Sequence, residues 1–450
     1  MKPTKIHSFS DAQAYLNSFV NYERNVKFPY AKTLKLDRVE TLLERLRISY
    51  QSLRVIHIAG TKGKGSTAYF CAHVLAASGF RVGLYTSPHF FNFRERIVIK
   101  KPVCSGQRTV VKDTCIAEKD VVEIVRGMQP ELERLRYKKT LGMLSFFEVY
   151  TAIAFTYFLK NHLDFVVLET GLGGRLDATN VVTPLCSVIT HIGYDHIDTL
   201  GTSLASIARE KAGIIKHAVP VIVASQRVSV YRQIRKRALK QRTPAFFFGR
   251  EIKATEIRLG KNSTTFNFHY NGIALKNIKI CLRGKYQIEN ASLAIASIMV
   301  LQQQGYVRGS VLFRQGLRDA FVAGRFETVK RNPLIVVDVA HNPSAFTALA
   351  ENLKLYFPAK KIILIFAASR DKDVRHMLDK IKYTQLILTR FSNPRSFTPD
   401  EIRSRCRIKN TLIASDVKEA LGMARQFCTR EHAIVISGSL FLVSEAKRIV

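Results

Sequence analysis

Residues 55–70, VIHIAGTKGKGSTAYF, contain the strongest local signal in the sequence. The first five residues are mostly apolar and predict a buried strand, and residues 66–77 have the length and pattern of a helix. Between them stand Gly60, Gly63 and Gly65, which allow several backbone N–H groups to point at one anion. The N-terminus of the helix adds a partial positive charge. A strand, a glycine-rich turn and a helix in this order predict a phosphate loop.

The residues of this turn are candidate contacts for a triphosphate. A phosphate loop uses a lysine at the β- and γ-phosphates and a hydroxyl near the metal ion, and Lys64 and Ser66 suit these roles. Because Gly65 separates Lys64 from Ser66, the sequence departs from the motif GxxxxGK[ST]. A glycine-rich turn without a ligand therefore remains the alternative. The candidates are Gly60, Thr61, Lys62, Gly63, Lys64, Gly65, Ser66 and Thr67.

Outward from this loop, short apolar runs alternate with amphipathic stretches. Further strands are predicted at 81–85, 165–169, 187–191 and 219–224, and a further helix at 147–159. This rhythm predicts an α/β fold with a mostly parallel sheet covered on both faces. Residues 246–283 have the composition of hairpins, and a second α/β block begins near residue 334. We expect domains at 1–320 and 326–450, joined by a hinge at 321–325.

The composition narrows the function classes. The chain has 450 residues with 47% hydrophobic, enough for a large core, which excludes disorder. Its 70 Lys and Arg against 35 Asp and Glu give a net charge of +35, which favours nucleic acid, an anionic membrane surface or acidic small molecules as partners. No apolar run approaches the ~18 residues of a membrane span. The start lacks the apolar stretch of a signal peptide, and seven scattered cysteines without a CxxC pair predict reduced thiols in a cytoplasmic protein.

Several residues outside the loop are candidates for a metal site. Glu169 ends a predicted strand, at the edge of an α/β sheet where ligands bind. His196 follows the next strand in HIGYDHIDTLG, and Lys211 lies in a predicted helix. Taken singly, each residue can also be explained without a metal site. Glu169 can cap a turn, His196 can be solvated, and Lys211 is one of many basic residues.

Taken together, the motifs resemble the folylpolyglutamate synthase and dihydrofolate synthase family of the Mur ligase superfamily. The matching segments follow in family order over most of the chain: GTKGKGS (60–66), TSPHFFNFRERI (86–97), GLGGRLDATN (171–180), DHIDTLGTSLASIAREKAGIIK (195–216), GKYQIENASLA (284–294), GRFE (324–327), DVAHNP (338–343) and, more weakly, SGSLFLVSEA (437–446). The chain departs from the family at Lys62, where many bacterial members have Asn, and at Val339, where Gly is usual.

The resemblance implies a fold and a reaction. It implies a P-loop-containing Mur-ligase-like ATP-binding domain followed by a smaller Rossmann-like glutamate-ligase domain. The implied reaction is the ATP-dependent addition of L-glutamate to dihydropteroate or to folate polyglutamates through an acyl phosphate. The implied partners are therefore small molecules, with no membrane and no specific nucleic acid, and the implied state is a monomer. Our hypothesis is that one enzyme has both activities. The alternative is a monofunctional folylpolyglutamate synthase.

The resemblance also implies roles for single residues. Ser87 would bind a first Mg²⁺, Glu169 would bridge two Mg²⁺ ions and His196 would bind the second. Lys211 matches a lysine that is carbamylated in much of the family, and Lys64, Lys211 and His196 are the implied catalytic residues. The implied nucleotide contacts beyond the loop are Asn290, Arg325, Asp338 and His341, with ATP between the domains. Phe146 and Phe147 would line the pterin side, or else form helix core.

Three other functions remain open at this point. A P-loop kinase would phosphorylate a small acid and release it. A Mur-type cell-wall ligase would share the chemistry, but its specificity domain normally precedes the loop, and Gly60 comes too early for that. A nucleic-acid-binding protein would use the basic run RQIRKRALKQR (232–242), where Arg232, Arg235 and Lys236 share a helix face. A solvated helix face is the simpler interpretation of that run.

Overall fold

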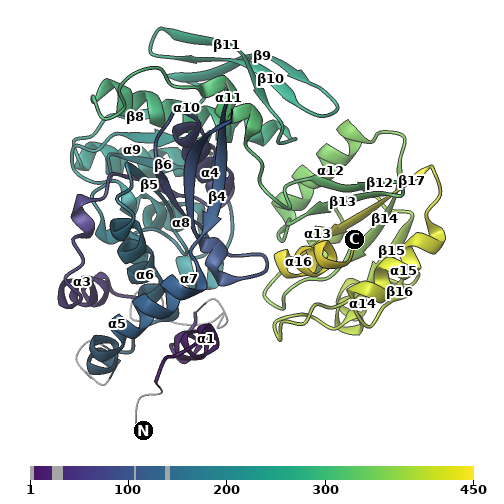
Figure 1. The fold of residues 1–450 in the computed structure, drawn as a ribbon. Coiled ribbons are helices and arrows are strands. Elements are labelled where there is room, and N and C mark those ends of the chain that lie inside the picture. Colours follow the sequence, from purple (N-terminus) through teal and green to yellow (C-terminus); the bar gives the residue numbers. More distant parts are fainter. Residues whose placement is uncertain (1–4, 23–33, 106–107, 137–141) are drawn as a thin grey trace. The chain divides into compact units, whose positions relative to one another are not determined.

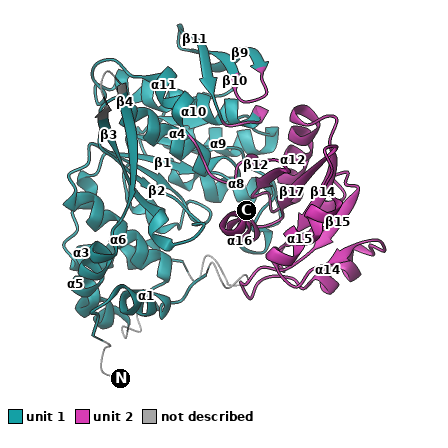
Figure 2. Ribbon diagram, turned by 45° about the vertical axis from the view of Figure 1, so that its right-hand side comes forward, with its two compact units in different colours: residues 1–258, 265–281, 286–320 teal, residues 259–264, 282–285, 321–450 magenta. Residues whose placement is uncertain are grey.

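The structure is a computed structural model that describes residues 5–22, 34–105, 108–136 and 142–450 (Figure 1). The chain divides into two compact units (Figure 2). Unit 1 comprises Met1–Arg258, Thr265–Cys281 and Tyr286–Ala320, and unit 2 comprises Leu259–Thr264, Leu282–Lys285 and Phe321–Val450.

Unit 1 is built on an eight-stranded sheet with the order β4-β3-β2-β5-β1-β6-β7-β8. Pairing is parallel from β2 to β8, whereas β3 pairs antiparallel with both β2 and β4. The strands are β1 (Val55–Ala59), β2 (Val82–Tyr85), β3 (Ile97–Ser105), β4 (Arg108–Cys115), β5 (Phe165–Glu169), β6 (Cys186–Ile189), β7 (Val221–Val223) and β8 (Ala245–Phe247). A mostly parallel α/β sheet is therefore confirmed.

Helices cover both faces of this sheet. Val55, Val166 and Leu168 point to one face, where they share a core with α5 and α6. Ala59 and Ile189 continue that face against α8 and α9, while α4 and its neighbour α11 lie on the other. The helices of unit 1 are α1 (Phe9–Asn17), α3 (Leu36–Arg45), α4 (Lys64–Ala77), α5 (Glu118–Arg136), α6 (Phe146–Lys160), α7 (Ile197–Leu200), α8 (Leu204–Lys211), α9 (Val228–Lys240), α10 (Lys285–Gln303) and α11 (Phe313–Asp319), with 3₁₀ turns η1 (Tyr50–Ser52), η2 (Phe93–Arg96), η3 (Ala178–Val181) and η4 (Ala212–Ile214).

The β-rich region after residue 246 forms a small sheet of its own. Its strands β9 (Ile252–Leu259), β10 (Thr264–Tyr270) and β11 (Ile273–Ile280) are neighbours in chain order. This agrees with the hairpins that the sequence predicts. A difference arises at β3 and β4, an antiparallel hairpin for which the sequence analysis names no strand. Lys100, Lys101 and Pro102 break the apolar pattern of β3, so the sequence contains no apolar run that would predict this strand.

Unit 2 contains a six-stranded sheet with the order β12-β13-β17-β14-β15-β16. Only β12 pairs antiparallel. The strands are β12 (Glu327–Arg331), β13 (Leu334–Asp338), β14 (Lys361–Phe366), β15 (Gln385–Leu388), β16 (Leu412–Ile413) and β17 (His432–Ser437). The helices are α12 (Pro343–Tyr356), α13 (Val374–Leu378), α14 (Pro399–Cys406), α15 (Val417–Phe427) and α16 (Leu440–Ile449). The second α/β block is thus confirmed.

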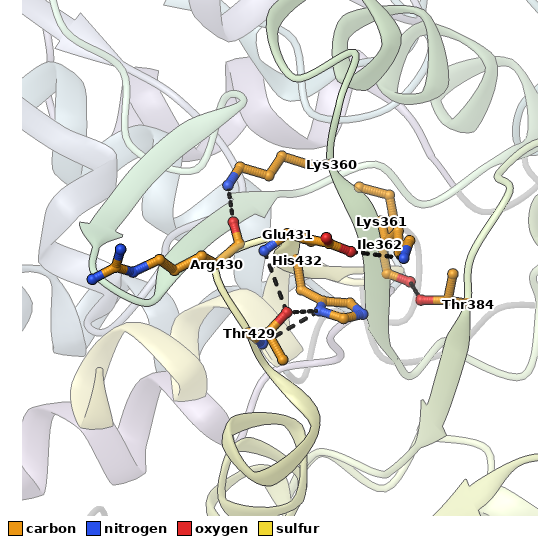
Figure 3. Close-up of polar contacts among 8 residues, drawn as sticks. All are labelled: Lys360, Lys361, Ile362, Thr384, Thr429, Arg430, Glu431 and His432. Carbon is orange, nitrogen blue, oxygen red and sulfur yellow. Dashed lines mark hydrogen bonds and ion pairs between the residues drawn. The ribbon is translucent and has the colours of Figure 1, made fainter.

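Hydrogen bonds and an ion pair connect residues at the amino ends of the central strands of unit 2 (Figure 3). Lys361 forms an ion pair of 2.7 Å with Glu431, just before β17. The hydroxyl of Thr384 donates to the carbonyl of Ile362 at 3.2 Å, and the hydroxyl of Thr429 lies 2.8 Å from His432 Nδ1. Since Asp338 lies at the opposite, carboxyl end of β13, these contacts stabilise the sheet and belong to no predicted site.

Candidate active site

The turn after β1 has a backbone that only glycine adopts easily. Gly63 has φ of 88° and precedes α4 directly. A Cβ on Gly63 would lie 2.3 Å from Asn290 Oδ1, and one on Gly60 would lie 1.8 Å from the hydroxyl of Thr190. The glycines are therefore required by close neighbours on α10 and after β6, and not only by the turn.

The main-chain N–H groups of Thr61 and Lys62 already have an acceptor within the protein. Both donate to the carbonyl oxygen of His191, at 3.0 and 3.1 Å. The hydroxyl of Thr61 donates to Gly193 O at 3.1 Å, and Thr67 is completely buried. These groups hold the loop against the segment after β6. Burial lowers the pKa of the Lys62 side chain to about 8, and the nearby Asp195 carboxylate opposes this shift.

The N-terminus of α4 offers the remaining amides. In the first turn of a helix, here Lys64, Gly65 and Ser66, the N–H groups have no intrahelical acceptor. The Lys64 side chain is mostly buried and its Nζ lies 3.8 Å from Glu169 Oε1. Three amides, a cation and the positive end of a helix are the components of an anion site.

The carboxylate of Glu169 lies at the carboxyl end of β5, as the sequence predicts. It is only 4% exposed, and its Oε2 accepts a hydrogen bond of 3.3 Å from the main-chain N–H of Ser87. Glu169, Ser87 and Lys64 therefore come together at the edges of adjacent strands β2, β5 and β1.

Lys211 is the most perturbed cation of this region. It ends α8, is 4% exposed, and its Nζ donates to the carbonyl oxygen of Gly60 at 2.8 Å. Burial lowers the pKa of Lys211 to about 7, and the Lys64 cation acts in the same direction, whereas Asp195 and Asp177 oppose it. Burial therefore makes the neutral amine far more accessible at Lys211 than at an exposed lysine.

The segment HIGYDHIDTLG contains an acidic residue that acts on both Lys62 and Lys211. Asp195, for which the sequence predicts no role, raises the pKa of Lys62 and of Lys211 against their burial. His196 is exposed, has φ of 50° and precedes α7. In the part of the chain that the structure describes, no three His, Cys, Asp or Glu side chains converge as a metal cluster.

Asn290 lies on α10 and reaches the loop from there. Its Nδ2 donates to Gln287 Oε1 at 2.9 Å, one turn earlier. Gln287 in turn donates to the hydroxyl of Ser66 at 3.4 Å. The sequence analysis did not single out Gln287, although its spacing of three from Asn290 places both on one helix face.

In unit 2, Asp338 ends β13 and is buried. Its two carboxylate oxygens accept hydrogen bonds of 2.8 Å from the N–H groups of Phe326 and Ala340. Burial raises the pKa of Asp338, and the neighbouring Arg325 guanidinium lowers it. His341 Nδ1 lies 2.9 Å from the carbonyl of Val339, a buried residue outside the set of positive-φ positions. The departure from glycine at Val339 is therefore tolerated by the backbone.

The two candidate pterin-side residues differ in their surroundings. Phe146 is 5% exposed and stacks on Tyr150 at 5.4 Å, which makes it helix core. Phe147 lies against Gly171, where an added Cβ would come within 2.6 Å of its ring.

The basic run 232–242 falls on α9. Val230, Ile234 and Ala238 form its buried face, whereas Arg232 and Lys236 are exposed. Most of the run is therefore a solvated helix face. Among the described residues, no helix combines the length and apolar character needed to cross a bilayer. The cysteines with described side chains are all free thiols.

Comparison with known proteins identifies the family. Residues 324–440 match the glutamate ligase domain of Mur ligases and residues 138–298 match the Mur ligase middle domain. The dihydrofolate synthase/folylpolyglutamate synthase of Bacillus subtilis is 32% identical over 425 residues, covering 92% of this chain and 94% of the relative. The folylpolyglutamate synthase of Lacticaseibacillus casei is 32% identical, covering 98% of each chain.

A solved structure agrees with the fold as well. The folylpolyglutamate synthase of Mycobacterium tuberculosis, complexed with ADP and AMPPCP, superposes with a TM-score of 0.83 at 27% identity, covering 93% of this chain and 96% of that one. With both Mur ligase domains and relatives matched over nearly their full length, the chain belongs to the folylpolyglutamate synthase and dihydrofolate synthase family of ATP-dependent ligases that join glutamate to folates.

Proposed function

We propose that this chain adds L-glutamate both to dihydropteroate and to reduced folates, with ATP as the energy source. The observation that carries the proposal is the convergence of Lys64, Glu169 and Lys211 around one phosphate loop. The domain boundaries 1–320 and 326–450, a monomeric state and a cytoplasmic location remain predictions from the sequence.

The reaction needs activation because a carboxylate is a poor electrophile. A carboxylate oxygen of the pteroate or folate attacks the γ-phosphorus of ATP, the bond to the β–γ bridging oxygen breaks, and ADP leaves. The amino group of glutamate then attacks the acyl carbon, phosphate leaves with the former carboxylate oxygen, and the nitrogen loses a proton. Phosphoryl transfer of this kind depends mainly on positioning and charge neutralisation.

The loop residues supply both positioning and charge neutralisation. The amides of Lys64, Gly65 and Ser66 are available to phosphate oxygens, and the Lys64 ammonium neutralises charge that moves toward the bridging oxygen. From α10, Gln287 donates a hydrogen bond to the Ser66 hydroxyl, and Asn290 lies close to where a Cβ on Gly63 would be. In unit 2, we assign Arg325, Asp338 and His341 to the nucleotide, with Asp338 toward the ribose.

The donor set near Glu169 fits Mg²⁺. This ion prefers oxygen ligands and keeps water and substrate phosphates in its shell, so a full cage of side chains is unnecessary. Glu169 and the hydroxyl of Ser87 would hold it, with His196 at a second ion, and bound Mg²⁺ would neutralise the triphosphate. The carboxylate already lies beside Lys64, which itself serves as the phosphate's cation.

Carbamylation of Lys211 also forms part of this proposal. Its burial favours the neutral amine, which is the form that attacks CO₂. A bond forms between Nζ and the carbon, one C=O electron pair moves to oxygen, and a proton leaves the nitrogen. The product is an anion beside Gly60, which would support the metal site.

The deciding experiment measures ATP-dependent incorporation of labelled glutamate with dihydropteroate and with tetrahydrofolate in parallel. We expect incorporation with both. Extension of tetrahydrofolate alone would leave a monofunctional folylpolyglutamate synthase. Formation of ADP and a released phosphorylated acid without any dependence on glutamate would instead indicate a kinase.

A further inference from the structure

Arg283 occupies the short segment Leu282–Lys285, which precedes the body of α10 in the chain. This segment packs as part of unit 2, whereas the following stretch Tyr286–Ala320 belongs to unit 1 (Figure 2). The Arg283 guanidinium faces three aromatic rings of unit 2, with centroid distances of 5.0 Å to Phe326, 5.6 Å to Tyr356 and 5.7 Å to Phe357.

Arg283 and the next residue also form hydrogen bonds beside this aromatic cage. Arg283 Nη2 donates to the carbonyl oxygen of Phe326 at 3.0 Å and to the hydroxyl of Thr328 at 2.6 Å. The next residue, Gly284, donates its N–H to the Tyr356 hydroxyl at 3.2 Å. Two consecutive residues of the segment are thus fastened to unit 2.

Phe326 connects this cage to the nucleotide residues of unit 2. Its N–H is held by Asp338 and its carbonyl by Arg283, so Phe326 is fixed from both sides. Phe326 also has φ of 45°, an uncommon backbone for a residue with a large side chain, which persists only when its surroundings determine it. The preceding residue is Arg325, one of the proposed nucleotide contacts.

We propose that Arg283 is a positioning residue that couples the aromatic cage to the nucleotide contacts Arg325 and Asp338 of unit 2. The coupling runs from Arg283 through the main chain of Phe326 to Asp338 and to the preceding residue, Arg325. It rests on the proposed function only in that Arg325 and Asp338 bind the nucleotide.

Arginine is suited to this position for a physical reason. Its planar guanidinium stacks on aromatic rings while donating hydrogen bonds in its own plane, and a lysine ammonium does not combine both. Arg283→Met removes both interactions, whereas Arg283→Lys keeps the charge. Arg405→Met is the matched control, because Arg405 also lies over a ring of unit 2, that of Phe397 at 4.9 Å, at the end of α14.

The test measures direct binding of a fluorescent ATP analogue, the KM for ATP and the KM for glutamate in the full-length protein. We expect Arg283→Met to weaken ATP binding and raise the KM for ATP by about tenfold, with Arg283→Lys intermediate and Arg405→Met unchanged. The KM for glutamate should stay within about twofold, since a general loss of structure would affect both substrates. Unchanged ATP binding in Arg283→Met, or an equal loss in Arg405→Met, would overturn the proposal.

A double-mutant cycle with Arg325→Met gives a second, independent measure. If Arg283 acts by positioning Arg325, the double variant should weaken ATP binding at least about threefold less than the product of the two single effects. Multiplicative effects would contradict the coupling. Should Arg283→Met fail to fold, Arg283→Lys carries the same cycle.

Failure of the proposed function has a different signature. Wild-type protein that binds ATP but incorporates no glutamate would refute the ligase assignment and leave the binding experiments with Arg283 decisive for the coupling. Conversely, an active ligase whose ATP binding ignores Arg283 would refute only the coupling.

Discussion

The ammonium of Lys211 donates a hydrogen bond of 2.8 Å to the carbonyl oxygen of Gly60, the first residue of the phosphate loop. This bond joins the end of α8 to the turn after β1 and brings a lysine from far along the chain to the candidate site. It also places a side chain whose pKa is lowered to about 7 directly behind the loop.

Lys211 should become carbamylated in a pH-dependent way. Since its folded pKa is lowered to about 7, the reactive neutral amine increases as pH rises from about 6 to 8. At constant dissolved CO₂, ¹³C NMR should show a carbamate signal that grows over this range and is absent in Lys211→Met. Lys211→Ala should lose most activity, and a short carboxylic acid should restore part of it. A high-resolution map of the active state with an unmodified ammonium would refute the modification.

The same lowered pKa predicts a pH dependence of stability. Between about pH 7 and 10.5 the unfolded chain binds a proton at Lys211 that the folded protein does not hold. The free energy of unfolding in CO₂-free buffer should therefore rise with pH over this window, relative to Lys211→Met. Urea unfolding of both proteins at pH 7 and pH 9 measures the difference, and parallel curves would argue against a perturbed lysine.

Lys64→Ala should abolish ATP turnover and leave the fold intact. The side chain contributes a cation at the phosphate site and only a weak ion pair to Glu169, 3.8 Å away. We expect kcat/KM for ATP to fall by about 100-fold or more. Lys160→Ala is the control, since Lys160 forms an exposed ion pair with Glu123 on another helix. Retained turnover in Lys64→Ala would remove the basis for the loop assignment.

Glu169→Gln should raise the Mg²⁺ concentration needed for half-maximal activity, by about tenfold or more. The amide keeps the shape of the side chain but loses the charge that attracts the ion. Glu123→Gln removes an exposed carboxylate and should leave the Mg²⁺ titration unchanged. Identical titrations of Glu169→Gln and wild type would exclude Glu169 as a ligand.

Gly63→Ala and Gly79→Ala separate backbone strain from contact with Asn290. Both glycines have positive φ, at 88° and 100°, so each alanine should cost about 1–2 kcal/mol of stability. Only at Gly63 would the new Cβ meet Asn290 Oδ1, whereas nothing lies within 4 Å of the Cβ position at Gly79. Gly63→Ala should therefore raise the KM for ATP, and Gly79→Ala should not. Equal KM values would show that the contact is unimportant.

The sequence alone predicts the central strands well. The predicted strands at 55–59 and 165–169 coincide with β1 and β5, because parallel strands buried on both faces are continuous apolar runs. The β3–β4 hairpin has no such signal. Its buried Lys100 is compatible with a strand only because register places Asp113 opposite, 2.6 Å from the ammonium.

The phosphate loop, the metal candidates and the family are determined by residue types and their order along the chain. Tertiary structure decides which groups remain available. The carbonyl of His191 occupies two loop amides, and no residue type encodes that, since every residue has a carbonyl. Likewise, Lys211 acquires its pKa, and Arg283 its aromatic cage, from neighbours distant in sequence, because burial and cation–π contact depend on three-dimensional packing alone.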